Sequence, residues 1–381
     1  MKKITKASHI LVIRLTDVAK AAMCVHALRG LRRDFPEVKL TVLTTSALRP
    51  LFRGVNGVDF LAADDVKYRG VFGGLHLWND IQHLGIDGVA DLEASPRSRR
   101  LRFCLTPWRR ITSTIERGKI ERKLLTRKFR KVMVQLSPLS QRSRDVFERL
   151  GLPFSMPAPV RRRRAGEPPH IATILAGEKS GRWIGVALLS HRKGNCYPID
   201  QSAELIKQLA ARYEKVFVFG SGTYQKQFCE GMESLFPSVV SVAERASLDE
   251  QMDLISVLDA VVTVDHPVLS LASLVGTPAI SIWGATHPFI ESCGYGQDPT
   301  YAVQLELPCR PCSADGRRAC LFGHYECMTR ISPEMVLARL LKLFREQKIV
   351  VLFYNLYIVL ITNTIHSHTR NLTHFPMLNY Y

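Results

Sequence analysis

The sequence has few acidic side chains for its basic ones: 34 Asp and Glu stand against 52 Lys and Arg, which gives a formal net charge of +18. It also lacks the pattern of a secretory signal, because the apolar run after the basic start MKKITKASH is short and is interrupted by Arg14. Neither an internal repeat nor a low-complexity array is present. We therefore expect a protein that stays in the cytoplasm and attracts polyanions.

The positive charge is concentrated between Arg97 and Arg164 and includes four consecutive arginines, Arg161–Arg164. Such a region attracts nucleic acid, anionic lipid headgroups or a phosphorylated glycolipid, and the alternative is a solvated basic helix face. Nucleic acid is the weaker option, because no recognition helix, RNP-type aromatic motif or zinc-finger spacing accompanies the charge.

The length and the alternation of apolar strands with amphipathic helices predict an α/β protein of two domains. A proline-rich stretch near the middle prevents regular structure and suggests the linker between them. The predicted divisions are an N-terminal domain with the basic region at 1–160, a linker at 161–182, a second domain at 183–346 and a tail at 347–381.

Apolar periodicity places elements in both halves of the chain. The first half has predicted strands at His9–Arg14, Val38–Leu43, Val58–Leu61 and Gly88–Leu92 and a helix at Val18–Arg33. The second half has predicted strands at Trp183–Leu188, Lys215–Gly220 and near Val239, helices after Asp200, from Thr223 and from Ser247, and a final helix at Ser332–Glu346. Glu250 three residues after Ser247 fits a capping box.

Residues Val261–Pro288 are predicted to form a strand, a helix and a second strand. The first strand ends at Asp265, and Gly276-Thr277-Pro278 ends the helix. In an open parallel sheet, ligands lie beyond the carboxyl ends of strands, where the next helix offers unpaired N–H groups. This segment therefore predicts a nucleotide or sugar-phosphate site.

A second glycine-rich turn, Gly220-Ser221-Gly222, follows a predicted strand and precedes a predicted helix. Its N–H groups are suited to approach a nucleotide. The alternative is that the glycines only make the turn.

Four of the nine cysteines have the spacing C-x2-C-x7-C-x6-C, namely Cys309, Cys312, Cys320 and Cys327. This spacing permits a tetrahedral zinc site or an iron–sulfur cluster. Disulfides are not expected in a cytosolic protein, so the alternatives are a structural metal site and reduced thiols. No feature indicates a catalytic metal, and any zinc is therefore expected to be structural.

The tail contains the apolar run IVVLFYNLYIVLIT, which is shorter than the ~20 residues that a bilayer-crossing helix needs. Three interpretations stay open for it: a hook in the membrane interface, a segment docked on the protein, and a non-native extension.

Five segments in a fixed order resemble the bacterial lipopolysaccharide heptosyltransferase family. Its GT-B fold has two Rossmann-like domains that face a cleft. The resemblance implies inverting transfer of heptose from an ADP-heptose donor to a lipopolysaccharide core or lipid A precursor, a phosphorylated glycolipid at the cytoplasmic face of the inner membrane. The segments are Ile10–Leu31, Ile115–Lys128, Lys193–Pro198, Val261–Pro288 and Leu307–Met328.

The first departure from the family concerns the catalytic base. The family's first strand–helix turn ends in Gly-Asp, with that Asp as the base, whereas this chain has Ala19-Lys20 there. Asp17, three residues earlier, is the candidate replacement, and the alternative is that Asp17 only caps the following helix. Lys20 retains the ability to attract the donor diphosphate.

Two further departures concern donor binding. Asn195 takes the place of a family Lys, while Lys193 or Arg192 either reaches a phosphate or belongs to an exposed basic loop. Ser270 takes the place of a family His, and His266 beside Asp265 has a capping or loop role as its alternative. The predicted donor-binding residues are Ser190, Lys193, Asn195, Gly220, Gly222, Asp265, His266 and Ser270.

The changes at Lys20, Asn195 and Ser270 favour one rival to heptosyl transfer. In that rival, the chain is a catalytically impaired relative that binds a nucleotide sugar or glycolipid, or supports a partner enzyme. A basic nucleic-acid-binding protein is the second rival and ranks below both.

Overall fold

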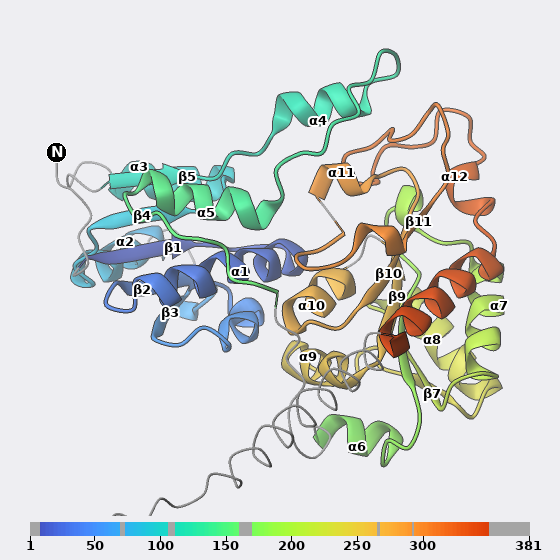
Figure 1. Cartoon of the computed structure of the whole chain (residues 1–381). Helices are drawn as coiled ribbons and strands as arrows, with labels where there is room; N and C mark the ends of the chain where they lie inside the picture. The colour runs from blue at the N-terminus through green and yellow to red at the C-terminus, as the bar shows by residue number, and fades with distance from the viewer. Residues whose placement is uncertain are drawn as a thin grey trace, which may run out of the picture.

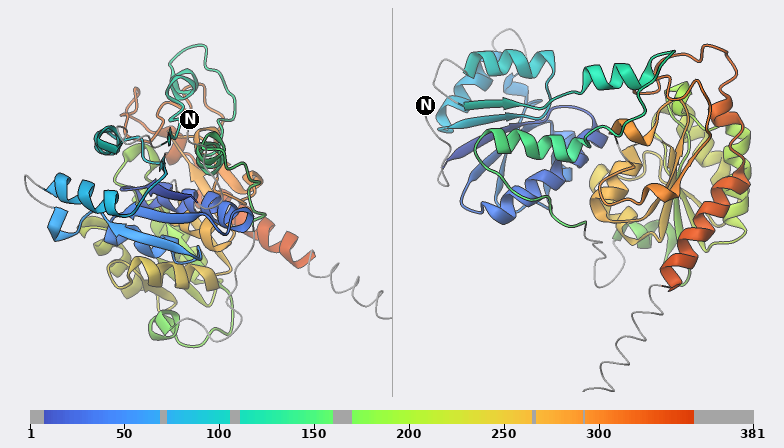
Figure 2. Two further views of the ribbon diagram at one scale, coloured as in Figure 1. Left: turned by 90° about the vertical axis from the view of Figure 1, so that its left-hand side faces the viewer. Right: turned by 45° about the horizontal axis from the view of Figure 1, so that its top comes forward.

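The computed structural model describes residues 8–68, 73–105, 111–159, 170–264, 267–291 and 293–349. Asp265, His266, the Arg161–Arg164 run and the apolar tail from Val350 on lie outside these residues. The described chain forms two parallel sheets, each covered by helices, and Figures 1 and 2 show them side by side as two domains. The prediction of an α/β protein with two Rossmann-like domains is confirmed.

The first sheet has the strand order β3-β2-β1-β4-β5, and all its strands are parallel. Its central strand is buried along its whole length, as expected for a parallel sheet with helices on both faces. The strands are β1 (His9–Ile13), β2 (Lys39–Thr44), β3 (Val58–Ala62), β4 (Gly88–Asp91) and β5 (Ile111–Thr114). The helices are α1 (Val18–Asp34), α2 (Gly73–His83), α3 (Pro96–Leu105), α4 (Lys119–Thr126) and α5 (Leu139–Arg149), with short 3-10 turns η1 (Ser46–Phe52) and η2 (Val66–Tyr68).

The second sheet is also parallel, with the order β11-β10-β9-β6-β7-β8. Its strands are β6 (Trp183–Ala187), β7 (Lys215–Val218), β8 (Val239–Ser241), β9 (Ala260–Val264), β10 (Ala279–Trp283) and β11 (Ala302–Gln304). Its helical elements are α6 (His170–Ala176), η4 (Lys193–Asn195), α7 (Ile199–Ala210), α8 (Thr223–Leu235), α9 (Leu248–Val257), α10 (Pro267–Val275), α11 (Pro288–Glu291), η5 (Pro299–Tyr301), α12 (Glu326–Thr329) and a last helix over 333–349.

The predicted capping box at the start of α9 is confirmed. The Ser247 hydroxyl accepts a hydrogen bond from the Glu250 N–H at 3.3 Å, and the Glu250 carboxylate accepts one from the Ser247 N–H at 2.8 Å. Two N–H groups that the helix itself leaves unpaired are therefore satisfied.

Two elements were not expected from the sequence. Strand β5 lies in the basic region, for which the sequence analysis places no strand, and its segment Ile111–Thr114, three of whose four residues are β-branched, pairs with β4. Helix α6 lies within the range expected to be a linker, and it packs Ile171 and Ala172 into the core beside α9. Local proline content therefore did not prevent a helix from forming in this range.

The last helix packs on the second domain (Figure 2). Leu340, Leu343 and Phe344 belong to the core of that domain, and the Arg182 guanidinium lies 4.0 Å from the centre of the Phe344 ring. Within the described residues, no helix combines the length and the apolar composition needed to cross a bilayer.

The two domains meet chiefly through α1 and α10 (Figure 1). Arg29 of α1 donates a hydrogen bond to the Leu274 carbonyl of α10 at 3.1 Å. Arg53, which follows η1, forms ion pairs with Asp249 and Asp253 of α9. Apolar packing and charge pairing therefore both join the domains.

A second contact between the domains is made by residues 118–136, which we call the arm. The arm contains α4 and reaches from the first domain to the second (Figures 1 and 2). The Leu136 N–H donates to the Phe289 carbonyl at 2.8 Å, Lys131 Nζ donates to the Pro311 carbonyl at 2.8 Å, and Arg318 donates to the Thr126 carbonyl at 3.3 Å. The arm is therefore fixed to residues 309–327, which we call the Cys segment.

The core of the second domain is tested by Phe217→Ala. Phe217 is fully buried, with its ring 5.2 Å from that of Trp183. Loss of a buried phenyl ring is expected to destabilise the domain by about 3–5 kcal/mol, because most of the cavity remains. Urea unfolding followed by tryptophan fluorescence measures the effect. Phe103→Ala removes an exposed ring and is the control, and equal midpoints for the two variants would contradict the packing described.

Candidate functional site

Each sheet has one point where the strand order reverses, which is where open parallel sheets bind ligands. In the first sheet the chain runs from β1 to β2 and β3 on one side and then returns to β4 on the other. In the second sheet it runs from β6 to β7 and β8 and then returns to β9. The loops after β1, β4, β6 and β9 are therefore the places to look for a site.

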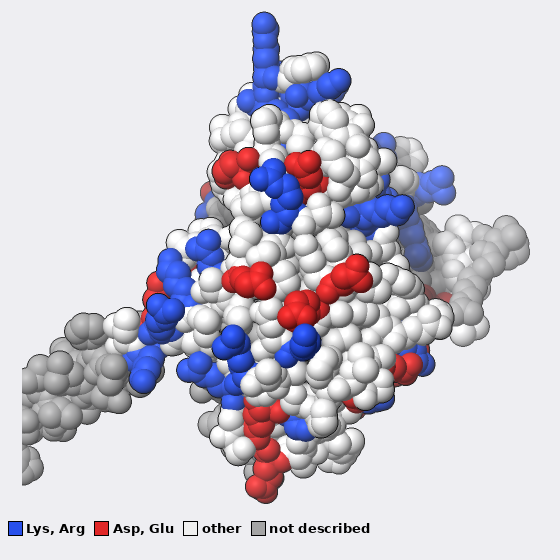
Figure 3. Space-filling model, turned by 90° about the vertical axis from the view of Figure 1, so that its right-hand side faces the viewer, with Lys and Arg blue, Asp and Glu red and all other residues white. Residues whose placement is uncertain are grey.

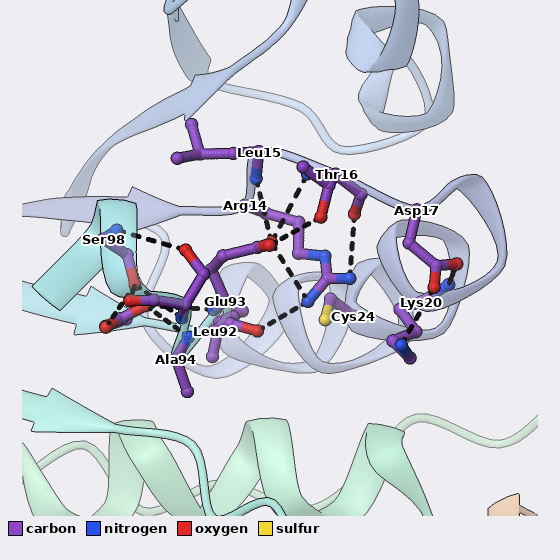
Figure 4. Close-up of polar contacts among 12 residues, drawn as sticks. Arg14, Leu15, Thr16, Asp17, Lys20, Cys24, Leu92, Glu93, Ala94 and Ser98 are labelled. Carbon is purple, nitrogen blue, oxygen red and sulfur yellow. Dashed lines mark hydrogen bonds and ion pairs between the residues drawn. The ribbon is translucent and has the colours of Figure 1, made fainter. Parts of the chain in front are cut away.

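The loop after β1 is held by Glu93, which follows β4 (Figure 4). Its carboxylate accepts hydrogen bonds from the N–H groups of Leu15 at 3.2 Å and Thr16 at 3.4 Å and from the Thr16 hydroxyl at 2.6 Å. Arg14 lies 3.4 Å from the same carboxylate, and both side chains are almost fully buried. Arg14 also donates to the carbonyls of Leu92 and Thr16, each at 2.8 Å. The two loops at this switch point therefore form one hydrogen-bonded unit.

Asp17 lies at the start of α1, next to Lys20 (Figure 4). Its carboxylate accepts a hydrogen bond from the Lys20 N–H at 3.1 Å and pairs with Lys20 Nζ at 2.9 Å. Asp17 therefore caps the helix, as one of the two sequence interpretations predicts. Its φ of +70° is unusual for a residue other than glycine, and such backbone strain is often found at functional sites.

The ion pair determines what Asp17 is able to do chemically. Burial alone would raise the pKa of the Asp17 carboxyl, but the Lys20 ammonium and the hydrogen bonds from Lys20 lower it below its ordinary value. Asp17 is therefore ionised at neutral pH, but it is a weak base, because general bases are most efficient with a pKa near the working pH.

Asp91, at the end of β4, shapes the loop that presents Glu93. It is fully buried and accepts hydrogen bonds from the N–H groups of Glu93 and Ala94, from the Ser98 hydroxyl and from Arg102 Nε, all at 2.7–3.0 Å. The sequence analysis missed both carboxylates. The signal was present, because Asp91 and Glu93 follow an apolar strand in the same way as Asp265 does.

In the second domain, the loop after β6 carries Ser190, Arg192 and Lys193. The Ser190 hydroxyl accepts a hydrogen bond from the Arg192 N–H at 3.2 Å, and the Arg192 side chain donates to the Asp315 carbonyl at 2.8 Å. Arg192 is therefore engaged with the Cys segment, whereas Lys193 is exposed to solvent. Of the two cations considered for phosphate binding, Lys193 is the better placed.

Asn195 is buried, with 1% of its surface exposed. Its side-chain oxygen accepts a hydrogen bond from the Thr286 hydroxyl at 3.1 Å, and it packs so closely on Gly316 that a Cβ there would lie 2.6 Å from Asn195 Cγ. Asn195 therefore joins the loop after β10 to the Cys segment. This role explains why an uncharged side chain fits the position.

The glycines after β7 have different roles. A Cβ on Gly220 would lie 3.0 Å from the Cys229 sulfur, so Gly220 allows α8 to pack closely on the sheet. Gly222 precedes α8 with a φ of +74° and faces the ring of His191, since a Cβ there would lie 3.6 Å from His191 Cε1. The loops after β6 and β7 therefore lie side by side at the carboxyl edge of the sheet.

The loop between β9 and α10 contains Asp265 and His266, which lie outside the described residues. Ser270 is half-buried in α10, four positions along the helix. The neighbouring loop after β10 contributes His287, which the sequence analysis did not select. Burial, with a smaller effect of Arg310, lowers the pKa of His287 to about 4, so the ring is neutral at pH 7.

The four cysteines of the predicted metal site line one small cavity of about 20 Å³. Burial alone would raise the pKa of Cys320, but the backbone N–H groups of residues 322–325 lower it. Burial raises the pKa of Cys327 to about 11. Among the described side chains, no three of Cys, His, Asp or Glu form a group that could hold a metal ion. Four thiolates are donors that suit zinc or iron. Their positions in this structure, however, are not those of a ligand set, so the metal site stays a prediction.

Residues 119–326 match the sequence model of glycosyltransferase family 9 (heptosyltransferase), and this match spans more than half of the chain. The chain therefore belongs to glycosyltransferase family 9. No curated protein sequence matches it.

Solved structures show the same GT-B fold. The Escherichia coli ADP-heptose lipopolysaccharide heptosyltransferase II is 18% identical, with a TM-score of 0.65 over 89% of this chain and 99% of the other. A family 9 glycosyltransferase from Veillonella parvula is 14% identical, with a TM-score of 0.67 over 91% and 99%. The iron-containing dodecameric glycosyltransferase TibC from enterotoxigenic E. coli is 12% identical, with a TM-score of 0.55 over 91% and 78%.

The metal prediction is tested by elemental analysis of protein purified without oxygen. If the four thiols around the cavity move together to bind metal, we expect about one zinc or iron per chain, because four Cys are a complete tetrahedral donor set. Cys320→Ser is expected to lose most of the metal and to lower the stability of the second domain. Cys196→Ser, which changes a thiol outside the cluster, is the control. If the wild-type protein contains no stoichiometric metal, the four cysteines are reduced thiols and the metal site is rejected.

Proposed function

We propose that this chain transfers heptose from ADP-heptose to a lipopolysaccharide core or lipid A precursor, with inversion at the anomeric carbon. The observation that carries the proposal is that each of the two sheets of this family 9 chain has a switch point with polar residues in its loops. One presents Asp17 and Lys20, and the other presents Lys193, next to the loop of Gly222 after β7.

The donor is supported by relatives and by chemistry. Structures of the E. coli heptosyltransferase WaaC contain ADP-2-deoxy-2-fluoro heptose and ADP, and one of TibC contains ADP-D-beta-D-heptose. In this chain a diphosphate would be attracted by the exposed Lys193 and by the N-termini of α8 and α10. Ser190, Gly220, Asp265, His266 and Ser270 complete the proposed donor site.

The acceptor and the location of the protein belong to the same proposal. A phosphorylated glycolipid is anionic and is held at a membrane, which suits a chain with a formal net charge of +18. We place the protein in the cytoplasm, peripherally bound to the inner membrane. Metal is not required for the transfer step proposed here.

In the reaction, a base removes the proton of the acceptor hydroxyl as its oxygen bonds to the anomeric carbon. The bond from that carbon to the diphosphate breaks, and ADP leaves with the electron pair. Asp17 is the candidate base, and the Lys20 ammonium beside it is placed to attract the diphosphate. Because the same ammonium lowers the pKa of Asp17, we expect slow transfer.

A second candidate function is supported by the same residues. Asp17 caps α1 and Asn195 has a buried connecting role, so neither position requires catalysis to explain it. A catalytically impaired relative that binds a nucleotide sugar or glycolipid would have this arrangement.

The deciding experiment measures donor hydrolysis and transfer by mass spectrometry, with ADP-heptose and a panel of other nucleotide sugars. Calorimetry with the same donors measures binding. Transfer from ADP-heptose supports the enzyme. Donor binding without turnover supports the impaired relative, and neither binding nor turnover would reject both.

The role of Asp17 is tested by Asp17→Asn. Asn is as good a helix cap as Asp, so the variant keeps the cap and removes the carboxylate that serves as the base and pairs with Lys20. We expect turnover to fall by about 10²–10⁴ with nucleotide affinity unchanged. Asp34→Asn, the same change at the exposed end of α1, is the control and should leave turnover unchanged. Turnover that survives Asp17→Asn would show that the base lies elsewhere.

A further inference from the structure

Exposed apolar side chains gather where the arm meets the Cys segment. Residues 127–134 and 317–324 form this surface, which we call the tip surface. Large apolar side chains are normally covered in a soluble protein, and a cluster of exposed ones marks a site of interaction. Its most exposed members are Phe129 at 71%, Leu321 at 63%, Phe322 at 63% and Val134 at 58%.

The same surface is rich in cations. Lys128, Arg130, Arg317 and Arg318 are all exposed, and Figure 3 shows Lys and Arg side chains gathered at the top of the molecule, where the arm and the Cys segment lie in Figure 1. The nearest acids offset only part of this charge, because Asp315 pairs with Arg317 at 3.3 Å and Glu326 pairs with Arg330, outside the tip surface, at 3.3 Å. The tip surface therefore keeps a positive balance.

An apolar groove of about 430 Å³ runs between the two segments. Phe129 lines it from the arm, and Leu307, Leu321 and Phe322 line it from the second domain. The charged and titratable residues Arg127, Lys128, Arg318, His324 and Glu326 also line it. Its apolar lining with several cations at its edge suits a hydrocarbon chain with an anionic group at one end.

The tip surface is held in one piece. Lys131 donates hydrogen bonds to the carbonyls of Cys309 and Pro311, and Arg318 donates to the carbonyl of Thr126. These contacts join segments that are nearly two hundred positions apart in the sequence. The exposed apolar and basic side chains of both segments therefore belong to a single fixed surface.

We propose that the tip surface is a membrane-docking surface. Its cations bind anionic lipid headgroups, while its aromatic and aliphatic side chains enter the interfacial region of the bilayer. Exposed aromatic and aliphatic side chains interleaved with Lys and Arg are what such binding requires, because both the apolar area and the charge contribute. Only the purpose of docking rests on the proposed function: the tip surface would bring the protein to an acceptor that is held in the membrane.

The test is co-sedimentation of the full-length protein with phosphatidylcholine vesicles, with and without phosphatidylglycerol. We expect binding only to the anionic vesicles. Lys128→Glu with Arg130→Glu should weaken it by roughly twentyfold or more, since each cation near an anionic surface contributes about 1 kcal/mol. Phe129→Ser with Phe322→Ser should weaken it by roughly tenfold through lost apolar burial.

Matched controls keep the charge change and the exposure the same. Lys39→Glu with Arg212→Glu changes two exposed cations away from the tip surface, and Tyr224→Ser with Leu235→Ser changes two exposed side chains of α8. Vesicle binding that falls equally in the control and tip variants would overturn the proposal. The proposal would also be overturned if the tip variants bound vesicles as well as the wild-type protein does but sedimented as a smaller species. The tip surface would then be a contact between copies of the protein.

The outcome is separable from that of the proposed function, because these vesicles contain no acceptor. Transfer to a water-soluble acceptor fragment should be the same in the tip variants and the wild-type protein. A protein that transfers no sugar but docks through the tip surface would reject the proposed function alone. If the protein is active and the tip variants bind vesicles as well as the wild-type protein does, only the docking surface is rejected.

Discussion

A parallel sheet that is covered by helices on both faces leaves only its strand ends open to ligands, and the whole site depends on this constraint. The central strands β1, β6 and β9 are buried along their full length, so none of their side chains is accessible to a ligand. Polar residues therefore collect in the loops at the carboxyl edges. The reversal of strand order then selects which of those loops lie next to each other.

Much of this edge could be predicted from the sequence, because it follows from local patterns. Apolar runs gave the strands β1, β6 and β9, and the capping box gave the start of α9. Asp17 was found because it follows a strand and precedes a helix. Both of its interpretations came from that placement, and the structure supplies the geometry of the cap.

The remaining features depend on contacts between distant segments, which a single sequence does not reveal. Glu93 acts on the loop after β1 from 77 or 78 positions away. Asn195 is understood only when Thr286 and Gly316 are seen against it. Strand β5 needs its partner β4 to be recognised as a strand. Tertiary partners, rather than local propensity, decide each of these cases.

The arm gives the two domains a second mechanical connection in addition to the chain between them. Its hydrogen bonds to Phe289 and Pro311 lie at one end of the domain boundary, and the packing of α1 on α10 forms another part of it. Arg53 of the first domain adds ion pairs with α9 at a further place on the boundary. A change in the angle between the domains would therefore have to break contacts at several places, including those of the arm.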